Sequence, residues 1–184
     1  MIKRVTKYPL NHASISFTKE LDTTYSFGRK VPNNPFIGGF VKEKLTGTLF
    51  QESNCAIYSC SVTECEYKQM LEFVQQIEKQ QNNYRYNFVG LFCVLLNKEL
   101  NRKRAFFCSE FVATILFKGG IQVKNKPASL TKPFDLTESE NLSLIYEGQL
   151  SSYLLQQESS HMEGEKSSCG ERDICLKIAK SIAS

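Results

Sequence analysis

The pattern of apolar and polar positions becomes regular at residue 12. In the string HASISF, alanine, isoleucine and phenylalanine would share one face of a strand, while His12, Ser14 and Ser16 would share the other. A second strand-like run, TTYSFG, follows at hairpin distance, and the proline- and glycine-rich string RKVPNNPFIGG is then expected to end it. The two runs are predicted to pair antiparallel.

Three later segments also favour strands. The strings KLTGTLF at 44–50 and CAIYSCSV at 55–62 mix aromatic, β-branched and small residues, which suit a pleated and partly buried surface. A shorter run, LSLIYEG at 142–148, is consistent with a last strand.

Helical periodicity begins at Thr63, where Thr63 and Glu66 form a capping box ahead of an apolar face. This helix is predicted to run to about Gln80. The continuous apolar run FVGLFCVLL at 88–96 is interpreted as a buried helix, with a strand as the alternative. In FFCSEFVATILFKGG, apolar residues recur at helical spacing before two glycines, which places Cys108 in the first turn of a further helix.

The length of 184 residues suits one domain, which we expect to occupy residues 1–155. Residues 156–172 are rich in serine, glutamate and glycine, a composition typical of linkers. The final string ICLKIAKSIA has isoleucines four residues apart. Residues 156–184 are therefore predicted to form a linker followed by a short docking helix or a disordered tail.

Composition limits the partners and the compartment. The 23 basic and 19 acidic residues leave a net charge of +4, too small and scattered for a nucleic-acid surface. The sequence lacks an 18-residue apolar run and the pattern of a signal peptide, so a cytoplasmic protein is expected. The seven cysteines show no paired knuckles, which favours reduced thiols. A basic loop contains Lys98, Arg102, Lys103 and Arg104, but such loops are usually solvated, so membrane contact is not favoured.

Candidate chemistry centres on Cys108, because the partial positive charge at a helix N-terminus favours the nucleophilic thiolate. The chain has two histidines, and His161 falls in the polar tail, which leaves His12 as the base. A third polar group must orient the imidazole. Ser26 on the neighbouring strand is the first candidate, and Thr24 is the second.

The same reasoning predicts how an oxyanion would be held. The backbone amide of Cys108 lies at the start of its helix and can donate to a tetrahedral intermediate, and Tyr86 is a tentative second donor. No metal and no organic cofactor are implied.

These residues resemble a known family. FCSEFVATIL is similar to the nucleophile helix of NlpC/P60 enzymes, which usually reads Cys-Ser-Gly-Phe-Val, and HASISF resembles their histidine strand. Here the histidine precedes the cysteine, as in the circularly permuted branch that contains YiiX-like hydrolases and the lecithin:retinol acyltransferase group. YNFVGLF at 86–92 also resembles the segment before the cysteine helix of the YiiX-like proteins. The resemblance covers residues 9–155 and implies an α+β, permuted papain-like fold, with an antiparallel sheet packed against the nucleophile helix.

The sequence departs from this family at two places. Glu110 stands where the family has glycine, which could narrow the cleft or place a carboxylate beside it, so Glu110 is a candidate oxyanion or substrate contact. The third member would be serine or threonine, where relatives carry histidine, glutamate, asparagine or glutamine.

The resemblance implies a cysteine hydrolase that cleaves an amide, ester or thioester bond through an acyl-enzyme, with a peptide or cell-wall peptide as the expected substrate. Two alternatives remain open. A binding module that has lost turnover would be consistent with Glu110 and Ser26, and it predicts an ordinary thiol. A lipid-directed acyltransferase or thioesterase would need the basic loop and the tail to act on anionic surfaces.

Overall fold

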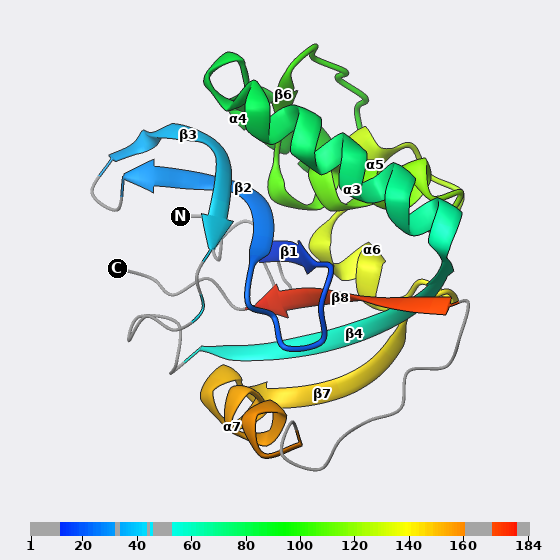
Figure 1. Ribbon diagram of the computed structural model, residues 1–184. Coiled ribbons are helices and arrows are strands. Elements are labelled where there is room, and N and C mark those ends of the chain that lie inside the picture. The colour runs from blue at the N-terminus through cyan, green and yellow to red at the C-terminus, as the bar shows by residue number, and fades with distance from the viewer. Residues whose placement is uncertain (1–11, 32–33, 44, 46–52, 161–170, 180–184) are drawn as a thin grey trace.

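A computed structural model describes residues 12–31, 34–43, 45, 53–160 and 171–179, and its centre is a six-stranded antiparallel sheet within a mixed α+β structure (Figure 1). Its strands lie in the order β3-β2-β1-β8-β4-β7. Their bounds are β1 (His12–Ser16), β2 (Thr24–Val31), β3 (Asn34–Glu43), β4 (Asn54–Thr63), β7 (Ser143–Gln149) and β8 (Glu171–Ala179). The predicted antiparallel pairing of the first two strands is confirmed, with Ile15 opposite Tyr25.

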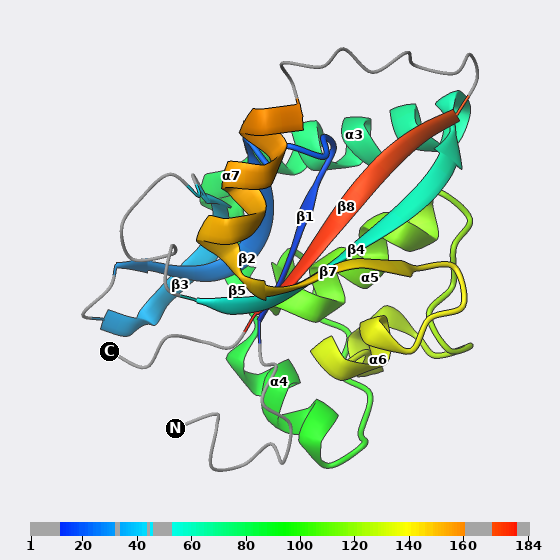
Figure 2. The same ribbon diagram turned by 90° about the horizontal axis from the view of Figure 1, so that it is seen from below.

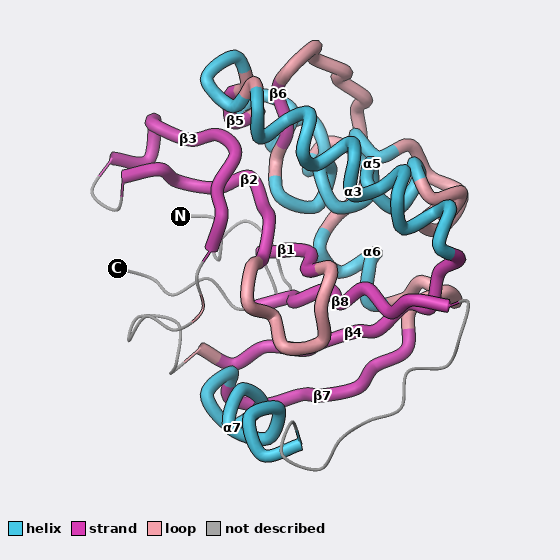
Figure 3. Tube along the Cα trace, viewed as in Figure 1, coloured by secondary structure: helices cyan, strands magenta, loops and turns pink. Residues whose placement is uncertain are grey.

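Helices cover both faces of this sheet. They are α3 (Glu64–Lys79), α4 (Phe88–Leu95), α5 (Cys108–Lys118), α6 (Pro133–Thr137) and α7 (Leu150–Ser160), with 3₁₀ turns η1 (Gln81–Asn83) and η2 (Ala128–Leu130). A short parallel pair, β5 (Arg85–Tyr86) and β6 (Ala105–Phe106), precedes α5. Figures 2 and 3 show α3 and α5 on one side of the sheet and α7 on the other.

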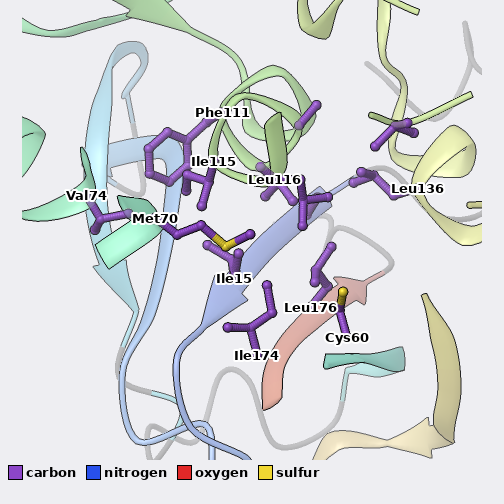
Figure 4. Close-up of a cluster of buried hydrophobic side chains, with 14 of the residues drawn as sticks. Ile15, Cys60, Met70, Val74, Phe111, Ile115, Leu116, Leu136, Ile174 and Leu176 are labelled. Atoms are coloured by element: carbon purple, nitrogen blue, oxygen red, sulfur yellow. The ribbon is translucent and has the colours of Figure 1, made fainter. Parts of the chain in front are cut away.

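Each face of the sheet has its own apolar core. The larger one joins α3 and α5 to β1, β4 and β8, and Figure 4 shows Ile15, Ile174 and Leu176 pointing toward the α5 side chains. The smaller core lies under α7 and includes Ile57, Leu150 and Cys175. Since each fully buried large apolar side chain contributes about 1.5–3 kcal/mol, the larger core fixes the position of α5 against β1.

The helix ends agree with the predicted caps. Thr63 caps α3, because the Glu66 amide donates to its hydroxyl at 3.3 Å and its own amide donates to the Glu66 carboxylate at 2.8 Å. Helix α5 ends at Lys118 and has Gly119 as its C-cap. The next residue, Gly120, has a φ of +78°, a backbone conformation that favours glycine.

The apolar run at 88–96 does form a helix, as expected, but it is not buried all round. Val89, Phe92 and Leu96 are 52%, 60% and 70% exposed. The predicted strand at 44–50 falls, apart from Leu45, outside the described residues.

The proline- and glycine-rich segment, which the sequence predicted to end the preceding strand, leads into another strand, β3. Its position at the edge of the sheet tolerates proline and glycine, which a central strand would exclude. Gly38 also has a packing role: a Cβ there would lie 2.8 Å from the Cβ of Tyr86, so glycine lets β5 lie against β3.

The tail also differs from its predicted structure. Residues 156–160 continue helix α7, and residues 171–179 form β8, which lies between β1 and β4 near the middle of the sheet. The predicted domain boundary at 155 therefore cuts off a strand of the sheet. Isoleucines four residues apart fit a period of two as well as a helical period. Both faces of β8 are buried, with Ile174, Leu176 and Ile178 in the larger core and Cys175 in the smaller one.

Within the part of the chain that the structure describes, every helix is too short or too polar to cross a bilayer.

Candidate active site

The site is built around the first residue of α5. Cys108 is 4% exposed, and the helix that it begins packs against β1 and β2. The hydroxyl of Ser109 donates to the Thr131 carbonyl at 2.7 Å and holds this first turn in place. The first residue of a helix lies beside unpaired backbone amides, which favour negative charge nearby.

His12 is the first residue of β1, and its side chain is 24% exposed. It interacts with the Cys108 side chain, so residues almost a hundred positions apart in the chain meet where β1 contacts α5. Burial by itself lowers the pKa of His12, but the charge of Glu43, together with hydrogen bonds to Cys108 and Glu43, raises that pKa to about 10. The imidazole is therefore protonated at neutral pH.

Glu43, the last residue of β3, supplies the contact that orients this imidazole. His12 Nε2 lies 2.7 Å from Glu43 Oε1. Burial alone would raise the pKa of Glu43, but the neighbouring charges of His12 and Lys177 hold it well below its usual range. The carboxylate is thus ionised beside the protonated ring.

A buried lysine completes this group of charges. Lys177 of β8 is 1% exposed, and its Nζ donates to Glu43 Oε2 at 2.9 Å. The two carboxylate oxygens therefore accept from different cations, one from β1 and one from β8.

The structure does not bring Ser26 to His12. Its hydroxyl donates to the backbone carbonyl of Ala13 at 2.7 Å and joins β2 to β1. The second candidate, Thr24, lies closer to the site, because its hydroxyl is 3.4 Å from Glu43 Oε2 and 3.3 Å from the Glu43 carbonyl. Both hydroxyls thus have other partners, and the imidazole Nε2 contacts Glu43.

Tyr86 lies near the thiol. Burial raises the pKa of Tyr86 well above its ordinary value, and the charge of Cys108 raises it further, while Arg29 opposes this shift. The phenol therefore stays protonated and can donate a hydrogen bond, which is what the predicted second oxyanion donor requires.

Glu110 points into the protein, where it braces two helix ends. It is 4% exposed, and its Oε2 accepts from the Phe107 amide at 3.2 Å and from Asn87 Nδ2 at 3.3 Å. Burial raises the pKa of Glu110 to about 7, although both hydrogen bonds act in the opposite direction. Asn87 in turn caps α4 by accepting from the Gly90 amide at 2.9 Å, so Glu110 links α4 to α5.

Sequence reasoning missed Glu43 and Lys177. The alternation FVKE at 40–43 was a possible indication of a strand with Glu43 on one face, but the preceding glycines obscured it. Lys177 was visible as a single lysine within an apolar string, ICLKIA, which is unusual unless the charge is paired.

The remaining predicted features are the basic loop, His161 and the absence of a metal site. The four basic residues of the loop at 98–104 are exposed, and His161 lies outside the described residues. Among the described residues, no three His, Cys, Asp or Glu side chains are placed to hold a metal ion.

The arrangement brings together a thiol, an imidazole and a carboxylate, with the Tyr86 hydroxyl nearby. Such a group can activate a thiol, protonate a leaving group and activate water. No family model, curated protein or solved structure matches this chain.

Proposed function

We propose that this protein is a cysteine hydrolase of the permuted papain-like, NlpC/P60 type, in which Cys108 forms an acyl-enzyme and His12 is the acid–base group. The observation that carries the proposal is the position of His12 between the Cys108 side chain and the carboxylate of Glu43, 2.7 Å away. Nucleophile, base and orienting group are the three parts that this chemistry requires. Glu43 takes the third position that sequence reasoning gave to Ser26.

The proposed reaction begins from a Cys108 thiolate paired with a protonated His12, consistent with a His12 pKa of about 10. The sulfur attacks the carbonyl carbon, and the oxyanion accepts from the Cys108 amide and the Tyr86 hydroxyl. His12 then gives its proton to the leaving amine, alcohol or thiol, and the thioester remains on Cys108. In the second half, His12 takes a proton from water, which attacks the thioester and releases the acid.

An amide of a peptide or cell-wall peptide is the proposed physiological bond, with esters and thioesters as chemically easier substrates. The proposed site needs no metal, because the charged side chains supply the acid–base chemistry.

A burst experiment with p-nitrophenyl acetate tests the proposal. We expect a stoichiometric burst of p-nitrophenol, followed by slow turnover, and a 42-dalton acetyl adduct on Cys108 by mass spectrometry. Cys108→Ala should lose both, whereas Cys65→Ala, which alters an exposed cysteine on α3, should lose neither. An adduct spread over several cysteines, or a burst that survives Cys108→Ala, would refute the proposal.

A second candidate, lipid-directed acyl transfer or thioester hydrolysis, is favoured by the exposed side chains Val89, Phe92 and Leu96 on and just after α4. The basic loop follows them directly, and apolar side chains beside basic ones are typical of surfaces that bind anionic lipid. Flotation with phosphatidylserine vesicles tests this candidate. Binding that Phe92→Ser weakens would support it, and no binding at low salt would exclude it.

A further inference from the structure

Lys177 is an unexpected residue at the middle of a sheet. It is 1% exposed on a strand whose neighbouring side chains on the same face, Cys175 and Ala179, belong to an apolar core. Removing an ammonium group from water is costly, and a buried ion pair is often no more stable than apolar residues of the same volume. Stability alone therefore gives a weak reason for a lysine here.

The partner of Lys177 provides a stronger reason. Nζ donates to Glu43 Oε2 at 2.9 Å, while Oε1 of the same carboxylate lies 2.7 Å from His12 Nε2. The Thr24 hydroxyl approaches Oε2 as well, at 3.4 Å. A carboxylate held from one side in this way cannot rotate freely, so its other oxygen stays directed at the imidazole.

We propose that Lys177 is a positioning residue of the active site, which keeps Glu43 ionised and aimed at His12 and so orients the base that serves Cys108. This inference rests on the proposed function, in which His12 is the base that serves Cys108. It also makes β8, a strand from the C-terminal end of the described chain, part of the catalytic apparatus.

Charge supports the same assignment. Among the residues that the structure describes, the charged groups that act on Glu43 are His12 on β1 and Lys177 on β8, and the Cys55 thiol on β4 also experiences the Lys177 charge. Removing the lysine removes a positive charge from a buried site, so Glu43 would take up a proton at a higher pH. A protonated Glu43 no longer stabilises the imidazolium.

The test compares Lys177→Met and Lys177→Arg with a control, Leu176→Ala. The control alters the preceding residue, which lies on the opposite face of β8. Two readouts report on orientation rather than on stability. One is the downfield NMR resonance of the His12 ring proton held on Glu43. The other is the acid midpoint of Cys108 alkylation by iodoacetamide, followed by mass spectrometry.

Lys177→Met should lose the downfield resonance and raise the acid midpoint by about one pH unit. Lys177→Arg should keep both wild-type values, and Leu176→Ala should lower the melting temperature without changing either. If Lys177→Met keeps the resonance and the midpoint, the positioning role is wrong.

If Lys177→Met does not fold, the comparison moves to the Glu43→Gln background, where both charges are removed together. There, Lys177→Met should not move the acid midpoint of Cys108 alkylation further, and an additional shift would show that Lys177 does not act through Glu43. The resonance does not depend on turnover. Loss of the Cys108 acyl adduct would therefore overturn the proposed function while leaving the positioning role to be decided by the resonance.

Discussion

The two ends of the candidate site are held in place by different forces. At the α5 end, Cys108 is positioned by the apolar packing of Phe111 and its neighbours and by hydrogen bonds local to the helix start. At the sheet end, His12, Glu43 and Lys177 come from three separate strands and are joined by buried charges. The α5 end contains one buried carboxyl group, Glu110, whereas the sheet end depends on paired charges, so the sheet end should lose stability in both acid and alkali.

The largest loss of stability is expected when one residue of the buried charged group is made neutral. Glu43→Gln removes the buried carboxylate that His12 and Lys177 both contact, and removing one partner of a buried pair costs about 3–5 kcal/mol. Urea unfolding at pH 7 measures this loss. The double variant Glu43→Gln/Lys177→Met should recover much of the lost stability. If the double variant is less stable than Glu43→Gln, paired charges do not hold the sheet end of the site in place.

The next effect is a pH dependence of stability. The pKa of His12 is raised from 6.5 to about 10, so its stabilisation is complete below pH 6.5 and is lost as the pH rises through 10. The pKa of Glu43 is lowered from 4.5, so its contribution is present above pH 4.5 and is lost as the pH falls further. Both contributions are complete only between these two ordinary values.

His12→Asn should therefore destabilise the protein more at pH 6 than at pH 10.5, by on the order of 2 kcal/mol after allowance for partial exposure. Urea unfolding of both proteins at the two pH values provides the measurement. An equal cost at both values would mean that His12 is held by packing, as Cys108 is.

The smallest effect tests whether Ser26 or Glu43 orients the His12 imidazole. Ser26→Ala removes the hydrogen bond to the Ala13 carbonyl and should cost about 1 kcal/mol. Because this hydroxyl does not contact His12, the rate of Cys108 alkylation should stay at its wild-type value. A slower rate in Ser26→Ala would instead support the assignment made from the sequence.

The difference between the two ends also explains what the sequence could predict. α3, α5 and the strands β1, β2 and β4 each have an unambiguous local period, and Cys108 and His12 lie on such elements. The edge strand β3 contains proline and adjacent glycines, and β8 contains isoleucines that fit two periods equally well. Pairing across long sequence distances decides both strands, so Glu43 and Lys177 could not be assigned from local patterns.

The most direct test of a Cys108–His12 pair is the alkylation rate of Cys108 by iodoacetamide between pH 5 and 9, with the labelled cysteine located by mass spectrometry. We expect selective labelling of Cys108 at pH 6, and about a hundredfold slower labelling there in His12→Ala. If Cys108 instead reacts at the same rate with and without His12, or stays unlabelled while Cys65 reacts, the two residues do not form a catalytic pair.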